Sequence, residues 1–167
     1  MSGTKLTPTK SVDLTQVGKQ PTDCGAVVGI FVADQLFGVP ILAVRDVLGP
    51  QRITRIPLAP PEVAGVLNLR GRIVTAIDMR RRLGLQARWL EDSCMSVVVE
   101  NGDELYSLIV DSVADVLNLP AEGYERNPFT LDPHWREISA GVCQLEGRLM
   151  VVLDVDDLIH FQHMATA

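Results

Sequence analysis

The sequence predicts a mainly β fold of two small β-barrels with a few short helices, produced by an internal duplication. Two blocks occur twice in the 167 residues. Residues 34–48, DQLFGVPILAVRDVL, match residues 103–117, DELYSLIVDSVADVL, at an offset of 69 with six identities in fifteen positions. Residues 65–77, GVLNLRGRIVTAI, match residues 141–153, GVCQLEGRLMVVL, at an offset of 76. Self-similarity on this scale indicates two copies of one structural unit.

The repeat divides the chain into two tails and two halves. Residues 1–24 are polar without apolar periodicity, which predicts a flexible N-terminal tail, and residues 161–167 are expected to be a C-terminal tail. The folded domain spans residues 25–160, with one subdomain at about 25–84 and the other at about 92–160. A unit of this size buries only about 60% of its unfolded surface, so we expect the halves to share a core.

Each half is predicted to open with a β-hairpin. Residues 26–41, AVVGIFVADQLFGVPI, contain two β-rich runs around a turn at Ala33 to Gln35, and the counterpart turn carries Asn101-Gly102, a strong hairpin pattern. Pro40 lacks a backbone donor, so its strand should end or lie at an edge there. Asp46 and its counterpart Asp115 are interpreted as part of a tight turn into the next strand.

Each half is predicted to close with a second hairpin and a short helix. Gly71 and Gly147 mark the turns, and each leads into an apolar strand that ends in an aspartate. Asp78 and Asp154 are good helix N-caps, and Gly84 is a good residue to stop the first helix. With these elements each half contains about five short strands.

The connector between the first half's blocks is predicted to contain one more short helix. Pro60-Pro61-Glu62 precedes Val63 and Val66, and proline is favoured in the first turn of a helix.

Composition and charge narrow the class of protein. The chain is 47% hydrophobic and 22% charged, which is typical of a soluble globular domain. It has no run of 18 apolar residues and no apolar stretch near its start that would fit a signal peptide, so we expect a cytoplasmic protein without direct membrane insertion.

The charge is spread unevenly along the chain. The net charge is −6 overall, with +4 over residues 25–84 and −11 over residues 85–160. An acidic chain argues against nucleic acid as a partner. Halves of opposite sign suit oriented contact with other proteins, although surface charge for solubility gives the same pattern.

No residue pattern indicates catalysis, a metal site or a cofactor. Asp154, Asp156 and Asp157 resemble a carboxylate cluster, but the first copy has Arg80 and Arg81 in place of the last two, which favours a capped acidic first turn over a metal site. The three histidines lack catalytic neighbours, and the three cysteines lack metal-ligand spacing, so packing or surface roles are expected for His134, His160, His163, Cys24, Cys94 and Cys143. There is no glycine-rich phosphate loop.

Arginines and tryptophans offer further candidates. The run Arg80 to Arg82 is interpreted as a solvated helix face. Trp89 and Trp135 lie outside the repeated blocks, where packing is the default role and partner contact the alternative. Arg70 occupies a turn in which the second copy has Glu146, so the turn itself does not require a cation. Arg70 either pairs with a neighbouring acid or faces a partner, and both readings stay open.

The residues resemble the CheW-type chemotaxis coupling proteins. GVLNLRGRIVTAIDMRRRLGL resembles the family signature, and FGVPILAVRDVLG, LYSLIVDSVADVL and GRLMVVLDVDDLI follow the family pattern in order, so the resemblance covers about residues 25–160. It implies two SH3-like five-stranded β-barrels lying side by side. Three positions depart from the pattern: Thr75-Ala76 replaces Pro-Val, Asp46 replaces Glu, and Ser107 replaces Gly.

The resemblance also implies a function and a set of contact residues. It implies a non-enzymatic adaptor, without a cofactor, that couples the cytoplasmic tip of methyl-accepting chemoreceptors to the regulatory domain of the histidine kinase CheA, at the inner face of the membrane. The implied receptor contacts are Val44, Asp46, Gly65, Arg70, Ser107, Val113 and Val116. For the kinase it suggests the outer face of the first barrel and no particular residues.

Three alternatives remain beside this reading. An enzyme would need convergent titratable groups, for which Asp156 and Asp157 are the candidates. A nucleic-acid binder would show salt-sensitive affinity. A CheW-like coupling protein of a non-flagellar pathway, in pili or development, is the closest alternative.

Overall fold

A computed structural model describes residues 25–86, 94–119, 124–126, 131–145 and 147–160. The predicted tails, Trp89 and Glu146 lie outside these residues. In chain order the elements are β1 (Ala26–Val32), β2 (Gln35–Pro40), the 3-10 helix η1 (Ile41–Ala43), β3 (Val44–Leu48), β4 (Val63–Leu69), β5 (Arg72–Asp78), α1 (Met79–Arg82), β6 (Met95–Asn101), β7 (Glu104–Val110), β8 (Ser112–Asn118), β9 (Tyr124–Glu125), α2 (Pro133–Arg136), β10 (Ser139–Leu145), β11 (Arg148–Leu153) and α3 (Val155–Ile159).

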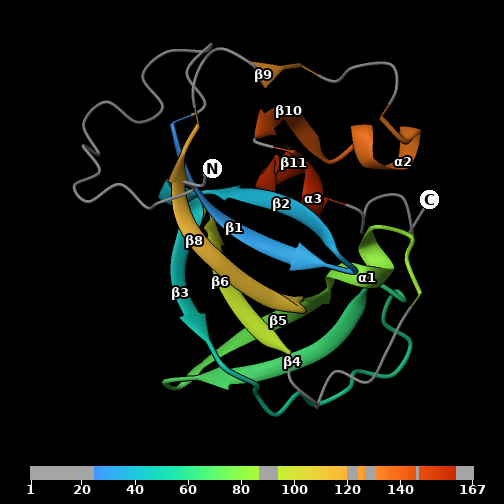
Figure 1. The fold of residues 1–167 in the computed structure, drawn as a ribbon. Coiled ribbons are helices and arrows are strands. Elements are labelled where there is room, and N and C mark those ends of the chain that lie inside the picture. Colours follow the sequence, from blue (N-terminus) through green and yellow to red (C-terminus); the bar gives the residue numbers. More distant parts are fainter. Residues whose placement is uncertain (1–24, 87–93, 120–123, 127–130, 146, 161–167) are drawn as a thin grey trace.

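The strands form two sheets, in agreement with the predicted mainly β class and its two SH3-like barrels. One sheet has the order β8-β1-β2-β11-β10-β9, and the other has the order β3-β6-β7-β5-β4. In Figure 1 the first sheet lies above and the second below, with the short helices α1 and α2 to the right. None of the helices in the described residues is long and apolar enough to span a membrane.

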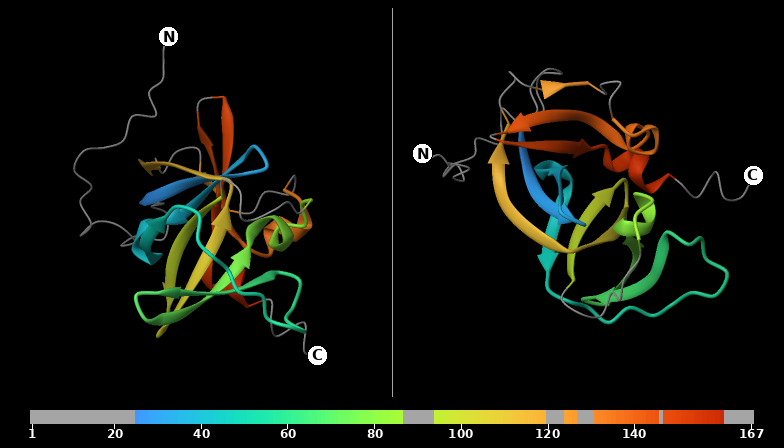
Figure 2. Two further views of the ribbon diagram at one scale, coloured as in Figure 1. Left: turned by 90° about the horizontal axis from the view of Figure 1, so that it is seen from below. Right: turned by 45° about the vertical axis from the view of Figure 1, so that its right-hand side comes forward.

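The opening hairpins are exchanged between the two halves. The hairpin β1-β2 pairs with β8 and β11 of the second half, and the hairpin β6-β7 pairs with β3 and β5 of the first. Figures 1 and 2 show the blue β1-β2 hairpin among the orange and red strands, far from it in sequence. The predicted boundaries at about residues 25–84 and 92–160 therefore mark copies of the repeat and do not mark separate sheets.

The two sheets are related by the repeat. Replacing each strand by its repeat counterpart turns the order β8-β1-β2-β11-β10 into β3-β6-β7-β5-β4. The registers agree as well. Val151 pairs with Phe37 where β11 meets β2 in parallel, and the counterpart pair Thr75 and Tyr106 joins β5 to β7, also in parallel. The two copies of the repeat therefore exchange their opening hairpins, as two subunits do in a domain-swapped dimer, but within one chain.

A central apolar cluster takes side chains from both halves, which confirms the expected shared core. Phe37 and Ile77 of the first half and Leu108 and Leu153 of the second are all completely buried in it. Burying such a side chain stabilises the fold by about 1.5–3 kcal/mol. Neither half can complete this cluster alone.

Several predicted local features are confirmed. The first hairpin turns at Ala33 and Asp34, which both have positive φ, and β2 ends at Pro40. Asp78 caps α1 by accepting hydrogen bonds from the backbone N–H groups of Arg80 and Arg81, as predicted. Asp154 caps α3 in the same way through Asp157 N. Gly84 stops α1 with φ of 75°.

Two local predictions are wrong. Pro60 to Glu62 form a turn and no helix, with Val63 N donating to Pro60 O at 2.9 Å. The chain extends there because Val63 begins β4 and the backbone of Glu62 accepts a hydrogen bond from Asp78 N at 2.8 Å.

Asp46 and Asp115 are not in tight turns. They lie inside the edge strands β3 and β8, and both strands have a register shift there. A bulge of this kind twists an edge strand and redirects its side chains.

Candidate interaction surface

Two of the predicted receptor contacts, Asp46 and Arg70, touch each other. A nitrogen of the Arg70 guanidinium lies 3.2 Å from the Asp46 carboxylate. Asp46 is on β3 and Arg70 is in the β4-β5 turn, so the pair bridges the two elements at opposite ends of the strand order β3-β6-β7-β5-β4. The Arg70 side chain is 77% exposed, and an ion pair this exposed contributes about 0–1 kcal/mol to stability.

The turn that carries Arg70 is fixed by its neighbours. Gly71 N donates to the side-chain oxygen of Asn68 at 2.9 Å, and Arg70 and Gly71 both have positive φ. This backbone directs the Arg70 side chain outward, next to Asp46. The two readings of Arg70 from the sequence are therefore compatible, because it pairs with an acid and is still exposed.

Three predicted contacts are valines on the two edge strands. Val44 lies on β3, whereas Val113 and Val116 lie on β8, and Val44 and Val113 are counterparts in the repeat. All three are partly buried and pack against the central cluster. Figure 1 shows β3 and β8 on the same side of the molecule. Their partly exposed atoms are the apolar part of the candidate surface.

Gly65 and Ser107 are not at the surface. Gly65 is buried, and a Cβ atom added there would lie 2.1 Å from the backbone oxygen of Thr54, so the close approach of two chain segments requires glycine. Ser107 is completely buried in β7, between β6 and β5. Both residues are internal, so neither Gly65 nor the Ser107 hydroxyl is exposed to a partner.

The sequence did not identify the exposed apolar side chains near this surface. Leu42 in η1 is 62% exposed, Val47 on β3 is 38% exposed, and Ile73 after the Arg70 turn is 67% exposed. The repeat carried a signal for one of them. Leu149, the counterpart of Ile73, is also a large hydrophobic residue next to a hairpin turn, and it is exposed as well. An apolar residue kept beside both hairpin turns, where no core requires it, is typical of a contact position.

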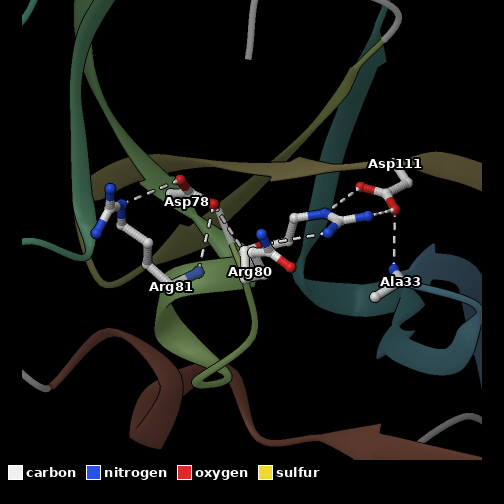
Figure 3. Close-up of polar contacts among 6 residues, drawn as sticks. Ala33, Asp78, Arg80, Arg81 and Asp111 are labelled. Carbon is white, nitrogen blue, oxygen red and sulfur yellow. Dashed lines mark hydrogen bonds and ion pairs between the residues drawn. The ribbon is translucent and has the colours of Figure 1, made fainter. Parts of the chain in front are cut away.

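The arginine run on α1 is not the predicted solvated face. Arg80 donates to both carboxylate oxygens of Asp111 at 3.1 and 2.7 Å, and these side chains are only 16% and 19% exposed. This carboxylate also accepts a hydrogen bond from Ala33 N at 2.8 Å, and it raises the pKa of Arg80. Figure 3 shows Arg80 directed at Asp111 and Arg81 directed back at Asp78.

Arg82 is buried and connects α1 to α3, the short helices that follow the last strand of each half. It donates to the backbone oxygens of Leu158 at 2.7 Å and Asp157 at 3.1 Å, at the end of α3. Free carbonyl groups at a helix C-terminus favour such a cation. Burial lowers the pKa of Arg82. Only Arg81, with a 51% exposed side chain, fits the predicted solvated role.

The remaining candidate groups have structural contacts. The ring of His134 lies 2.9 Å from the backbone oxygen of Arg82, and the indole N–H of Trp135 donates to Leu83 O at 2.9 Å. Cys94 and Cys143 are buried thiols, and burial raises the pKa of Cys143. Among the described residues there is no cluster of three or more His, Cys, Asp or Glu side chains placed to hold a metal ion. Cys24 and His163 lie outside the described residues.

Comparisons with known proteins agree on one family. Residues 26–163 match the CheW-like domain. The chain is 31% identical over 146 residues to the chemotaxis protein CheW of Rhizobium meliloti, covering 87% of this chain and 94% of that protein. It is 31% identical over 134 residues to the CheW of Klebsiella aerogenes, covering 80% and 81%.

A solved structure supports the same assignment. The scaffolding protein CheW of Thermoanaerobacter tengcongensis superposes with a TM-score of 0.70 at 28% identity, covering 81% of this chain and 90% of that one. Protein PilI of Pseudomonas aeruginosa is 31% identical over 119 residues, covering 71% and 67%. With a family match over most of its length and relatives above 30% identity, the chain belongs to the CheW-like family.

Proposed function

We propose that this protein is a non-enzymatic chemotaxis adaptor, which couples methyl-accepting chemoreceptors to a CheA-type histidine kinase in the cytoplasm, at the inner face of the membrane. The observation that carries the proposal is the family match over residues 26–163, shared with proteins named for chemotaxis and scaffolding. An adaptor works through its contact surfaces. The thiols of Cys94 and Cys143 are buried, and Arg80 and Arg82 are held by contacts with the other half.

The proposed receptor contact combines the Asp46–Arg70 pair with the edge strands β3 and β8. The receptor tip is a helical hairpin by resemblance, and a helix docks with apolar anchors beside polar contacts. Val44, Val113 and Val116 supply partly exposed apolar atoms, and Arg70 supplies an exposed cation. Leu42, Val47 and Ile73 extend the apolar part. Gly65 and Ser107 shape the strands from inside.

The proposed kinase contact is the outer face of the barrel in which the first half contributes β3, β4 and β5 and the second half contributes β6 and β7. The first half carries a net charge of +4 and the second −11, which favours oriented contacts between neighbouring proteins over random ones. No individual kinase-binding residue is proposed.

The experiment compares Arg70→Ala with Arg72→Ala in receptor-dependent kinase activation. Both arginines are exposed and lie in the same hairpin, so Arg72 is a matched control, whereas the repeat counterpart Glu146 lies outside the described residues. Arg70→Ala should change the free energy of unfolding by no more than about 0.5 kcal/mol and weaken receptor binding by about 2 kcal/mol, or roughly 30-fold. Arg72→Ala should leave activation near the wild-type level.

A destabilised Arg70→Ala variant with normal coupling per folded molecule would assign Arg70 to the structure alone. The second candidate function is a CheW-like coupling protein of a non-flagellar pathway, in pili or development. A pull-down with the whole chain as bait distinguishes it from the chemotaxis adaptor. The similarity to Protein PilI supports this second candidate function. The identity of the receptor and kinase recovered together decides between the two pathways.

A further inference from the structure

A surface pocket of about 470 Å³ lies where the β6-β7 turn meets α3. The β6-β7 hairpin supplies Asn101, Asp103, Glu104 and Tyr106, and α3 with its C-cap supplies Asp156, Ile159 and His160. None of these residues belongs to the proposed receptor contact, so the pocket is a separate feature of the surface.

The repeat identifies the residues of the first copy that correspond to this pocket. The counterparts of Tyr106 and Ile159, at offsets of 69 and 76, are Phe37 and Leu83. Trp135 of α2 covers this position, with its ring edge-on to Phe37 at a centroid distance of 5.4 Å and its indole N–H donating to Leu83 O at 2.9 Å. In the first copy, therefore, an aromatic side chain fills the site.

The site in the second copy is not filled in this way, because the first half has no aromatic residue at the position that corresponds to Trp135. At the offset of 76, Trp135 corresponds to Ala59, and His134 corresponds to Leu58. Leu58 is fully exposed at a positive φ of 66°, in a turn that contributes nothing to the pocket lining in the described residues. The site over Tyr106 is thus left open, while its counterpart over Phe37 is closed.

The charges of the pocket differ from those of its counterpart. Asp156 stands where the first copy has Arg80, and its carboxylate accepts a hydrogen bond from Asn101 at 3.1 Å and lies 3.5 Å from the His160 ring. The Tyr106 hydroxyl donates to Glu104 at 2.8 Å, and burial raises the pKa of Tyr106 to about 12, so the hydroxyl stays protonated. With Asp103 the rim carries three carboxylates around an aromatic floor, which favours a cationic partner.

We propose that this pocket binds a tryptophan side chain next to a basic residue, presented by a short turn of a partner protein. The tryptophan packs against Tyr106 as Trp135 packs against Phe37, and its indole N–H donates to a backbone oxygen at the end of α3. The basic neighbour pairs with Asp156 and Glu104. Such rigid aromatic anchors beside a cation are enriched at the energetic centres of protein interfaces.

The test uses a capped peptide, Pro-His-Trp-Arg-Lys, which keeps the sequence of residues 133–136 and ends in lysine. Titration into the full-length, isotope-labelled protein should shift the backbone amide resonances of Asn101, Asp103, Ile159 and His160. Peptides with Ala for Trp, or with Glu for Arg and Lys, should bind at least about tenfold more weakly. Equal binding of the Ala peptide would reduce the site to charge attraction and overturn the proposal.

Asp156→Arg introduces the first copy's residue at a position whose side chain is 62% exposed, so it should fold normally and lose peptide binding at least tenfold. Glu125→Arg makes the same charge change at an exposed position outside the pocket and should bind like the wild type. Normal binding by Asp156→Arg, or shifts elsewhere on the protein, would disprove the site. Peptide binding only after deletion of residues 161–167 would make the chain's own C-terminus the occupant, and shifts that depend on protein concentration would make it a second copy.

Discussion

At the scale of single residues, Ser107 carries a buried polar atom without a hydrogen-bond partner among the described residues. Leaving a buried hydroxyl unpaired costs about 1–3 kcal/mol. Its repeat counterpart is Gly38, where an added Cβ would lie 2.8 Å from the sulfur of Met150. β7 therefore has room for a side chain at a position where β2 does not.

Ser107→Ala keeps the Cβ atom and removes the unpaired hydroxyl. We expect it to raise the free energy of unfolding by about 1 kcal/mol, measured by urea denaturation. Ser139→Ala is the control, because the Ser139 hydroxyl is also buried but donates to Gly141 O at 3.2 Å, so its removal should lower stability. A loss of stability in Ser107→Ala would mean that the hydroxyl has a favourable interaction after all.

Asp78 gives the clearest pH dependence. Burial raises its pKa above the ordinary value of 3.8, and this effect outweighs the hydrogen bonds from Arg81 N and Arg80 N. Because the folded protein holds this proton more tightly than the unfolded chain, the associated stability is complete below 3.8 and is lost as the pH rises through the folded pKa.

Asp78→Asn keeps a side-chain oxygen for the cap but does not titrate. The unfolding free energy of the wild type minus that of Asp78→Asn should therefore decrease as the pH is raised from below 3.8 toward neutrality. Urea unfolding of both proteins over a series of pH values measures this difference. An increase with pH would show that the folded pKa is lowered instead.

At the scale of elements, the bulge in β4 depends on Gly65. Thr54 exchanges two backbone hydrogen bonds of 2.8 Å with Val66, which brings its oxygen to the position that a Cβ of residue 65 would occupy. Gly65→Ala must push the connector away from β4. We expect a loss of about 2–3 kcal/mol of stability, measured by chemical denaturation.

Gly49→Ala is the matched control for this substitution. An added Cβ at Gly49 meets no atom within 4 Å, and its φ is not in the positive region. Its effect should stay within about 0.5 kcal/mol. Comparable losses in both variants would show that the contact with Thr54 does not decide the effect, because the lower entropy of the unfolded chain after Gly→Ala acts in the opposite direction.

At the scale of the whole molecule, the exchanged hairpins make the two halves interdependent. Each sheet needs strands from both halves, and Arg82 and the Arg80–Asp111 pair add polar links between them. We expect residues 25–86 and residues 94–160, produced separately, to show no cooperative thermal unfolding. When mixed, they should form a one-to-one complex with the circular dichroism spectrum of the intact chain.

Independent folding of either half, with a cooperative transition of its own, would contradict this prediction. The intact chain should unfold in a single transition seen equally by circular dichroism and tryptophan fluorescence. Two separate transitions would show that the sheets are thermodynamically independent despite the shared core.

The sequence determined many of the local features and the family, because these depend on neighbouring residues and on repeated patterns. The two hairpins, the caps at Asp78 and Asp154 and the stop at Gly84 each follow from a few adjacent residues. The duplication was visible as two matched blocks, and the CheW-like resemblance followed from motifs in order. For the candidate surface, the family resemblance predicted Asp46 and Arg70 as contacts, and nothing in the sequence showed that the two side chains touch.

Only the tertiary structure decided which strands pair and which polar groups are buried. A strand with one apolar face satisfies its own pattern equally well beside either copy of its partner, so the exchange of hairpins leaves no trace in periodicity. Arg80 and Arg82 resemble a solvated run until Asp111 and the end of α3 are placed against them from the other half. Gly65 and Ser107 likewise became internal only when Thr54 and the neighbouring strands closed over them, since burial is fixed by contacts between segments distant in sequence.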